Sequence, residues 1–542
     1  MSEKLRVVIA QLNATVGHVT KNCDALIEAA QKAQADHSAD VIVFPELFLT
    51  GYPAEDLLYR EAFLEQVDVA IEKIKRDVKD IHCIVSYPKK TKVGLQNAAS
   101  VFYNGEELGF YAKQCLPNFS VFDEARYFKP GSTPLVIPIN GVPVGVVVCE
   151  DLWHDGPVKQ SVDAGAKVIL SPNASPFSIS KDDKRKSILK GEAKKSNVII
   201  CYTNLLGGQD DLVFDGGSMI LNGEGEVCAQ APFFEESLMP VDIELDGDKT
   251  NVIKQDPPKP LTHEERAYKA ILMGLKDYVE KNGFPGILLG LSGGIDSALS
   301  AAIAVDAIGA ENVTGVLMPS RYTSDESIQL ALDQVKMLGI KHEIISIEEP
   351  FDAFLDSLSD IFVETEEGIT EQNLQARCRG TTLMALSNKF GSMVLSTGNR
   401  SELAVGYATL YGDMAGGFCA ISDVPKTLVY KLSEYRNTLS HVIPQSVIDR
   451  PPTAELAENQ LDTDSLPPYD QLDHILELYI DLEHSVDEIT NVGFDRDVVV
   501  NIIRQVQRNE YKRRQAAPGV RLRERAFGRG RRYPITRGYR EL

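Results

Sequence analysis

The stretch LLGLSGGIDSALSAA, residues 288–302, joins an apolar run to an alanine-rich helical pattern through two adjacent glycines. A strand, a glycine turn and a helix start form a cradle for phosphate, because the N–H groups of the first helical turn point at the anion. The stretch lacks the Lys-Ser/Thr ending with which a Walker loop reaches the terminal phosphates of a nucleotide. We therefore expect a phosphate loop of another kind within an α/β fold.

Helical and apolar β-rich patterns alternate on both sides of this loop. Such alternation is typical of a doubly wound parallel sheet, which binds ligands at the carboxyl ends of its strands. A helix is predicted to begin at Thr262, which fits a capping box with Glu265, and to end at Gly283. The segment 350–372 is acidic and carries little strand pattern, so we expect it on the surface. The predicted strands are 286–292, 312–318, 341–347 and 391–399.

The first 245 residues mix short strands, hairpins and helical patterns. The hairpins turn at Asn104-Gly105 and Asn222-Gly223, because Asn-Gly favours tight turns with positive φ. This mixture predicts packed sheets that are covered by helices. The predicted strands are 5–12, 39–46, 82–88, 98–113, 142–151, 166–175, 197–204 and 217–232, and the helical patterns include 20–36 and 61–79.

The domain boundary is predicted from composition. Residues 246–260 are polar and proline-rich without any periodic pattern, which is typical of a linker. We therefore expect one domain over 1–245 and a second over 261–542, joined by 246–260.

Composition narrows the class of protein. The 542 residues are 43% hydrophobic and 25% charged, as in an ordinary globular protein, and no run of 18 apolar residues occurs. The eight cysteines are scattered, without a C-x-x-C pair or a histidine at zinc-finger spacing, so we expect neither a zinc site nor a disulfide framework. These features predict a cytoplasmic protein without a membrane partner.

Charge is distributed unevenly along the chain. The net charge of −22 disfavours nucleic acid as a partner of the whole protein. The segment 504–542 is nevertheless strongly basic, with thirteen Lys or Arg against three Glu. A basic tail that touches RNA or membrane is one interpretation. We favour the other, a lid that brings positive charge to an anionic substrate.

The loop LSGGIDS, residues 291–297, follows Gly290. It resembles the pyrophosphate loop of the N-type ATP pyrophosphatases, which cleave ATP between the α- and β-phosphates. The resemblance accounts for the missing Walker lysine and implies a Rossmann-like domain. Further segments are similar to those of NAD synthetases: MPSRYTSDES (318–327), EQNLQARCRG (371–380), LSTGNRSELAVGYATLYGDMAGGF (395–418), DVPKTLVYKL (423–432), PPTAELAENQLDTDSLPPYDQLD (451–473) and NEYKRRQAAPGVRLRERAFGRGRRYPI (509–535).

The NAD synthetase resemblance implies a reaction and its residues. It implies ATP-dependent amidation of nicotinic acid adenine dinucleotide (deamido-NAD) to NAD through an adenylated intermediate, with release of AMP and pyrophosphate. Asp296 and Glu402 are implied to hold Mg²⁺, although Glu402 also fits a first-turn helix carboxylate. The implied ATP-binding residues are Gly290, Leu291, Ser292, Gly293, Gly294, Ile295, Asp296, Ser297 and Thr397, and the implied deamido-NAD-binding residues are Asn373, Arg377, Glu402, Asp413 and Lys512, with Arg379 nearby.

Three reactive side chains in the first half each follow a predicted strand: Glu46, Lys113 and Cys149. A thiol can act as nucleophile, a carboxylate as general base, and an ammonium group can stabilise a tetrahedral oxyanion. Each residue alone also fits an ordinary structural role. A Cys149–His154 pair is a further alternative, although five residues along one loop seldom give the required geometry.

The Glu–Lys–Cys set resembles the site of the nitrilase (carbon–nitrogen hydrolase) superfamily, as do FDEARYF (122–128) and LSPNASPF (170–177). The resemblance implies an α-β-β-α sandwich and a glutaminase that acts through a Cys149 thioester. It implies glutamine-binding roles for Phe119, Ser175 and Lys181, with Phe119 at a position where tyrosine is common, and a supporting role for Glu124.

Taken together, the two halves of the chain resemble the glutamine-dependent NAD(+) synthetases. They imply ammonia transfer through an internal channel and a homo-oligomer built on a dimer of the synthetase domain. Two alternatives stay open. The same ammonia machinery could serve a different acid, or the chain could be a glutamine or nucleotide sensor without turnover.

Overall fold

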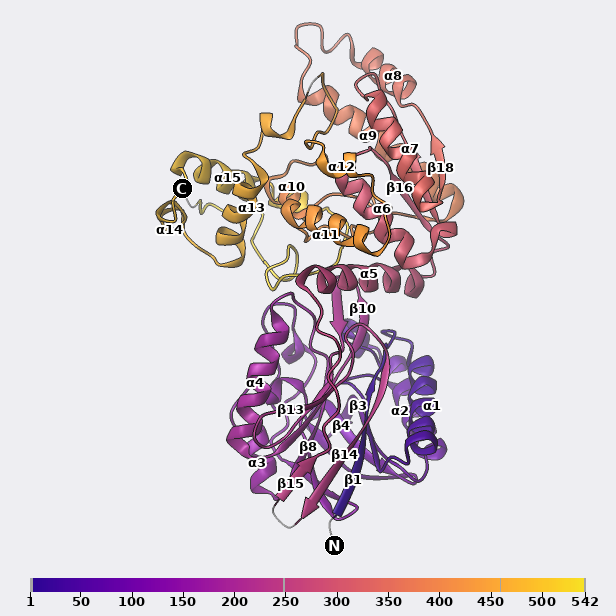
Figure 1. Ribbon diagram of the computed structural model, residues 1–542, viewed down its shortest axis with the longest axis vertical. Coiled ribbons are helices and arrows are strands. Elements are labelled where there is room, and N and C mark those ends of the chain that lie inside the picture. The colour runs from indigo at the N-terminus through magenta and orange to yellow at the C-terminus, as the bar shows by residue number, and fades with distance from the viewer. Residues whose placement is uncertain (1–2, 247–248, 459, 541–542) are drawn as a thin grey trace. The chain divides into compact units, whose positions relative to one another are not determined.

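The computed structural model describes residues 3–246, 249–458 and 460–540, and it divides into two compact units, Met1–Pro260 and Leu261–Leu542 (Figure 1). No helix within the described ranges is long and apolar enough to cross a membrane.

The first unit contains two large sheets and a small hairpin. One sheet has the order β15 (Lys249–Val252), β14 (Ser237–Asp246), β1 (Glu3–Gln11), β2 (Val41–Val43), β3 (His82–Thr91), β4 (Gly94–Tyr103) and β5 (Glu106–Ala112). The other has the order β13 (Val227–Gln230), β12 (Met219–Leu221), β9 (Ile199–Asn204), β8 (Val168–Asn173), β7 (Val142–Val146) and β6 (Leu135–Ile139). The hairpin pairs β10 (Leu206–Gln209) with β11 (Leu212–Asp215).

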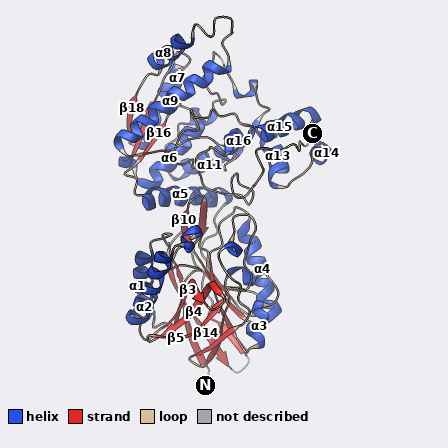
Figure 2. Cartoon of the chain, turned by 180° about the vertical axis from the view of Figure 1, so that it is seen from behind, coloured by secondary structure: helices blue, strands red, loops and turns tan. Residues whose placement is uncertain are grey.

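Alternating side chains build the layers of this unit. In β1, Val7 belongs to the core that both sheets share, and Val8 belongs to the core under two helices. Those helices are α1 (Val19–His37) and α2 (Glu61–Asp77), and the opposite side carries α3 (Pro157–Asp163) and α4 (Lys181–Ser196) (Figure 2). The expected α-β-β-α sandwich is confirmed, with both predicted helical patterns.

Two local features bear on the sequence predictions. The hairpin turn between β4 and β5 has positive φ at Asn104 (48°) and Gly105 (92°), as the Asn-Gly pair predicts. The segment 246–260 is not wholly a linker, because β15 pairs antiparallel with β14 at the edge of the first sheet. This short edge strand was not predicted, because the segment is polar and proline-rich.

The second unit is built on a four-stranded parallel sheet in the order β18 (Lys341–Ile344), β17 (Val313–Leu317), β16 (Ile287–Gly290) and β19 (Met393–Val394). All four strands fall within the predicted runs. The chain proceeds from β16 toward β18 and then returns to β19 on the other side of β16. The strand order therefore reverses between β16 and β19, where a sheet of this kind forms a ligand crevice.

Helices surround this sheet. Thr262 caps the first of them, α5 (His263–Asn282), by accepting a hydrogen bond from the Glu265 N–H, and Gly283 ends it, as predicted. The predicted surface segment 350–372 is largely helical, in α8 and the start of α9. The remaining helices are α6 (Ile295–Ile308), α7 (Asp325–Leu338), α8 (Glu348–Leu358), α9 (Ile369–Phe390), α10 (Arg400–Val405), α11 (Lys426–Leu439), α12 (Gln445–Asp449), α13 (Tyr469–Leu476), α14 (Val486–Asn491), α15 (Arg496–Arg508) and α16 (Glu510–Arg513).

The basic C-terminal segment packs into the fold of this unit. The Arg513 guanidinium donates to the Ala404 carbonyl at 2.6 Å and pairs with Glu510, which also pairs with Arg531. Arg523 pairs with Asp481 at 2.9 Å. These arginines are therefore paired with acids inside the unit, and the lid that brings positive charge to an anionic substrate stays a prediction.

Candidate active sites

A buried ion-paired centre lies where β2 and β5 of the first unit end. Lys113 follows β5, and its Nζ lies 2.6 Å from Glu46 Oε1 and 2.8 Å from Glu124 Oε1. Burial opposes the charge of Lys113, but the two carboxylates outweigh it and raise the pKa of the ammonium group well above its usual range. Lys113 is therefore held as a cation between two acids.

Cys149 begins a single 3-10 turn, Cys149–Leu152, after the end of β7. Its φ of 47° lies in the left-handed region, which is uncommon for a non-glycine residue and recurs at functional sites. Burial raises the pKa of the Cys149 thiol well above its usual range, the Glu46 carboxylate raises it further, and the Lys113 ammonium group lowers it. The structure thus brings together the three predicted residues Glu46, Lys113 and Cys149.

Backbone and side-chain donors fix the two carboxylates. The Asn97 side-chain amide donates to Glu46 Oε1 at 2.7 Å and to Glu124 Oε2 at 3.3 Å. The Ala174 N–H donates to Glu46 Oε2 at 3.1 Å. The Tyr52 hydroxyl donates to Glu124 Oε1 at 2.9 Å, and burial raises the pKa of Glu124 to about 7. Glu124 thus supports Lys113, as the sequence predicts, while Asn97 and Tyr52 were not predicted.

Asp151 connects the cysteine turn to the lysine strand, a role that was not predicted from the sequence. The buried Asp151 carboxylate accepts hydrogen bonds from the N–H groups of Cys115 (2.7 Å), Gln114 (3.1 Å) and Val148 (3.3 Å). It also accepts one from the Tyr111 hydroxyl at 2.8 Å. The sequence signal for Asp151 was a carboxylate two residues after Cys149, but only the fold shows which groups it binds.

Two of the predicted glutamine-binding residues, Phe119 and Lys181, share Phe122 as a neighbour, and Ser175 adjoins this centre. Phe119 is 57% exposed and contacts Phe122 edge to face, and the Lys181 ammonium group lies 5.8 Å from the centre of the same Phe122 ring. Ser175 is buried and follows Ala174, whose N–H binds Glu46. The alternative nucleophile pair is not formed, because the exposed His154 contacts Glu150 at 3.0 Å.

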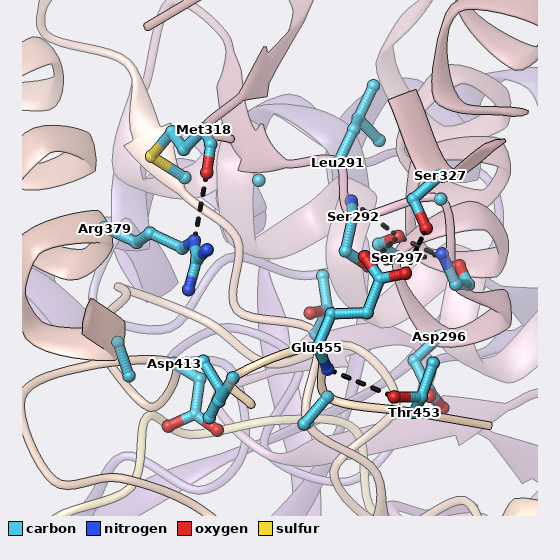
Figure 3. A pocket seen from close by; sticks show the side chains of 18 of the residues that line it. Leu291, Ser292, Asp296, Ser297, Met318, Ser327, Arg379, Asp413, Thr453 and Glu455 are labelled. Carbon is cyan, nitrogen blue, oxygen red and sulfur yellow. Dashed lines mark hydrogen bonds between the residues drawn. The ribbon is translucent and has the colours of Figure 1, made fainter. Parts of the chain in front are cut away.

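A cavity of about 300 Å³ lies in the second unit at the reversal of strand order (Figure 3). All nine predicted ATP-binding residues line it, together with Glu402 and Asp413. Gly293 has a φ of 78°, and a Cβ there would lie 2.4 Å from the Ser327 carbonyl oxygen, so only glycine fits. Gly294 precedes α6, and the hydroxyls of Ser292 and Ser297 lie 3.1 Å apart beside it.

An unpredicted lysine connects the two predicted metal ligands. The ammonium group of the buried Lys426 pairs with Asp296 and, at 3.3 Å, with Glu402 Oε1. Burial, with Asp296 nearby, raises the pKa of Glu402 to about 8. Lys426 is the first residue of α11, where the helix dipole disfavours a cation. The sequence signal for this contact was a lysine at the first position of a helical pattern, because a cation there indicates that acidic partners lie nearby.

The remaining predicted residues gather around the turn 406–413. Lys512 Nζ donates to the carbonyls of Gly406 and Ala408, each at 2.8 Å, and burial lowers the pKa of its ammonium group. Asn373 accepts from the Thr409 hydroxyl at 2.8 Å.

Arg377 and Asp413 meet at the same turn. Arg377 donates to the Leu410 carbonyl at 3.3 Å, and Asp413 accepts from the Thr409 N–H at 2.6 Å. Burial raises the pKa of Asp413 to about 6. Arg379 lines the cavity and donates to the Met318 carbonyl at 3.1 Å (Figure 3).

Two family models match the chain, one in each half. A carbon-nitrogen hydrolase model matches residues 6–247, and an NAD synthase model matches residues 267–516. The glutamine-dependent NAD(+) synthetase of Xanthomonas campestris pv. campestris (strain 8004) is 48% identical over 541 residues, which cover 99% of this chain and 98% of that protein. The protein of that name from Acinetobacter baylyi is 47% identical, with 99% of each chain covered.

Solved structures agree with these matches. The glutamine-dependent NAD+ synthetase from Acinetobacter baumannii, in complex with ADP, is 44% identical with a TM-score of 0.80, and the match covers 100% of both chains. A second such structure, from Cytophaga hutchinsonii, has a TM-score of 0.82 at 23% identity over 99% of this chain and 98% of that one, which shows a shared fold.

Proposed function

This chain belongs to the glutamine-dependent NAD(+) synthetases, and from this premise we propose how its residues carry out the reaction. The enzyme is a carbon–nitrogen ligase that converts deamido-NAD to NAD with ATP, and its nitrogen comes from glutamine. The observation that carries the assignment of residues is the presence in one chain of the buried Glu46–Lys113 pair beside Cys149 and of the glycine-loop cavity.

The first half-reaction releases ammonia from glutamine. Glu46 accepts the Cys149 thiol proton while Sγ attacks the side-chain carboxamide carbon, and Lys113 stabilises the resulting oxyanion. When the C–N bond breaks, Glu46 returns the proton to the leaving ammonia. Glu46 then takes a proton from water, which hydrolyses the Cys149 thioester to glutamate. The burial of all three side chains supports this assignment, because a buried site keeps bulk water away from the thiol.

Glutamine itself is held by residues at the edge of this centre. We assign Ser175, Lys181 and Phe119 to that role. The ammonium group of Lys181 suits the α-carboxylate of the amino acid, and the exposed ring of Phe119 suits its aliphatic part. The contact of both residues with Phe122 supports a common binding surface.

The second half-reaction takes place in the glycine-loop cavity. The nicotinate carboxylate of deamido-NAD attacks the α-phosphorus of ATP, pyrophosphate leaves, and ammonia then displaces AMP from the adenylated carboxyl carbon. The loop 290–297 holds the pyrophosphate through its N–H groups and serine hydroxyls, with Thr397 as a further contact to ATP. The dinucleotide is assigned to Asn373, Arg377, Glu402, Asp413 and Lys512.

Asp296 and Glu402 are proposed to hold Mg²⁺. Carboxylate oxygens are ligands that Mg²⁺ prefers, and the Lys426 ammonium group bonded to both acids marks a position suited to positive charge. When bound, the ion would neutralise charge on the phosphates of ATP. Lys426 is proposed to bind the same phosphates.

Three further properties are proposed on chemical grounds. Ammonia is largely protonated at neutral pH and would be lost to water, so a shielded channel from Cys149 to the cavity is expected. A homo-oligomer built on a dimer of the synthetase domain is also proposed, and light scattering would measure it. The eight free cysteines support a reducing, cytoplasmic environment.

The test of the substrate compares acceptors. With ATP, glutamine and Mg²⁺, the enzyme should release AMP in the presence of deamido-NAD, and it should release none with xanthosine monophosphate or aspartate. AMP formed only with one of the other acids would overturn the assignment.

A further inference from the structure

A strap, residues 451–456, crosses the wall of the glycine-loop cavity and places one carboxylate inside it. All six strap residues line the cavity. Glu455 has a φ of 47°, a left-handed conformation that a glutamate rarely adopts, and its N–H donates to the Thr453 hydroxyl at 3.2 Å. Figure 3 shows the Glu455 side chain extending toward Ser327, on the side of the cavity where Ser292 and Ser297 lie.

The Glu455 carboxylate is held by a niche of three donor side chains, Ser324, Ser327 and Arg450, which we call the anion niche. The hydroxyls of Ser324 and Ser327 each lie 2.8 Å from Glu455 Oε1. The Arg450 guanidinium donates to the same oxygen at 2.9 Å and to the Ser327 hydroxyl at 2.6 Å. An arginine with two hydroxyls is also the donor set that binds phosphate oxygens.

The anion niche adjoins the phosphate loop. Gly293 packs so closely on Ser327 that a Cβ would lie 2.4 Å from the Ser327 carbonyl oxygen. Ser327 and Arg450 line the same cavity as the loop. A phosphate chain bound along the loop therefore lies next to the niche that Glu455 occupies.

We propose that the anion niche is a subsite for the pyrophosphate part of ATP, and that Glu455 occupies it until the nucleotide arrives. The inference rests on the proposed function insofar as ATP is the ligand. Pyrophosphate and the Glu455 carboxylate compete for the same donors, so binding of pyrophosphate releases the strap from α7.

Competition makes a quantitative prediction for inorganic pyrophosphate. Titration calorimetry on the full chain with magnesium pyrophosphate, without glutamine or deamido-NAD, compares the wild type with Glu455→Gln. Pyrophosphate cannot enter the subsite while Glu455 occupies it, so the apparent affinity for pyrophosphate falls in proportion to the fraction of molecules in which the subsite is free. Removal of the Glu455 charge should therefore lower the Kd for pyrophosphate about fivefold. A Kd equal to or higher than that of the wild type would overturn the proposal.

Glu458→Gln is the matched control. Glu458 is an exposed glutamate three residues farther along the chain, so the substitution makes the same change of charge outside the niche. The wild-type Kd is expected for this variant. An equal gain in Glu458→Gln would mean that general charge, rather than occupancy of the niche, controls the affinity, and would overturn the proposal.

A second substitution tests the niche itself. In the Glu455→Gln background, Arg450→Met should remove the gain in affinity, and a retained gain would overturn the subsite. Should the Arg450 variant not fold, Ser327→Ala makes the same prediction with a smaller change. NAD formation is measured separately. If the wild type forms NAD but Glu455→Gln leaves the Kd for pyrophosphate unchanged, only the subsite is rejected. If Glu455→Gln binds pyrophosphate more tightly but the wild type forms no NAD, only the proposed function is rejected.

Discussion

The ammonium group of Lys113 lies 2.6 Å from the carboxylate of Glu46, and neither side chain is exposed to solvent. A buried charge is costly unless it is paired, and removal of one partner from a buried pair typically costs about 3–5 kcal/mol. The fold therefore holds the proposed base and the proposed oxyanion-stabilising cation together as a buried pair. The Glu46 carboxylate raises and the Lys113 ammonium group lowers the pKa of the Cys149 thiol, so both charges act on the proposed nucleophile.

Cys149→Ala should separate the two nitrogen sources. Without its nucleophile, glutamine-driven NAD formation should fall by about 10³-fold or more, whereas ammonium-driven formation should change by less than about twofold. Parallel assays of NAD with each nitrogen source measure the ratio. Cys228→Ala, which removes a thiol outside the site, serves as the control. An equal loss with both sources would contradict the roles assigned to the two units.

Glu124→Gln should change how stability depends on pH. Burial raises the pKa of Glu124 from 4.5 to about 7 in the folded state, so the folded protein binds this proton more tightly than the unfolded chain does. The stabilisation from the protonated form is present below pH 4.5 and is lost as the pH rises toward 7. The variant lacks this dependence.

Urea denaturation at several pH values, compared between wild type and Glu124→Gln, measures the effect. The difference in unfolding free energy should shift in favour of the variant as the pH rises from 4.5 to 7. A constant difference across this window would show that the Glu124 carboxyl does not titrate as described.

Asp296→Asn should abolish NAD formation with both nitrogen sources, because the proposed role of this carboxylate in adenylation does not depend on what supplies the ammonia. Mn²⁺ binding, followed by electron paramagnetic resonance, should weaken by about tenfold or more when one of two carboxylate ligands loses its charge. Chelation of divalent cations should reproduce the loss of activity in the wild type. Asp360→Asn, an exposed substitution on the same unit, is the control; retained activity in Asp296→Asn would remove the loop from the mechanism.

Much of the fold could be predicted from the sequence, because the decisive patterns are local. The strands β16, β17 and β19 of the second unit are largely apolar, whereas β18 is exposed along its length. Thr262 and Gly283 mark the ends of α5 by cap chemistry alone. The strand β15 was missed, because a short edge strand needs little apolar surface and so leaves no periodic pattern.

The candidate sites were predictable where a reactive side chain follows a strand, as Glu46 and Lys113 do. Lys426 and Asn97 could not be found in this way, because their partners lie far away in the sequence. The basic C-terminal segment 504–542 is a second case in which contacts could not be predicted from the sequence. Its charge predicted a lid for an anionic substrate, whereas the pairing of Arg513 with Glu510 and of Arg523 with Asp481 depends on packing that composition does not reveal.

Asp151→Asn should impair the glutamine reaction through the position of Cys149. An asparagine keeps the shape of the side chain, but its NH₂ group replaces an oxygen that accepts hydrogen bonds, so at least one donor from the Gln114–Cys115 backbone or the Val148 N–H is left unpaired. An unpaired buried donor costs about 1–3 kcal/mol.

The structural reason makes the kinetic prediction specific. Since Asp151 touches the cysteine turn and the residues after Lys113, its loss should lower kcat for glutamine by about tenfold or more with a smaller change in KM, and should slow alkylation of Cys149 by iodoacetamide. The ammonium-driven rate should stay at the wild-type value. Asp155→Asn, an exposed aspartate close by in the chain that pairs with Lys195, is the control. A pure increase in KM with unchanged kcat would instead place Asp151 in glutamine binding, since positioning of the nucleophile must act on the chemical step.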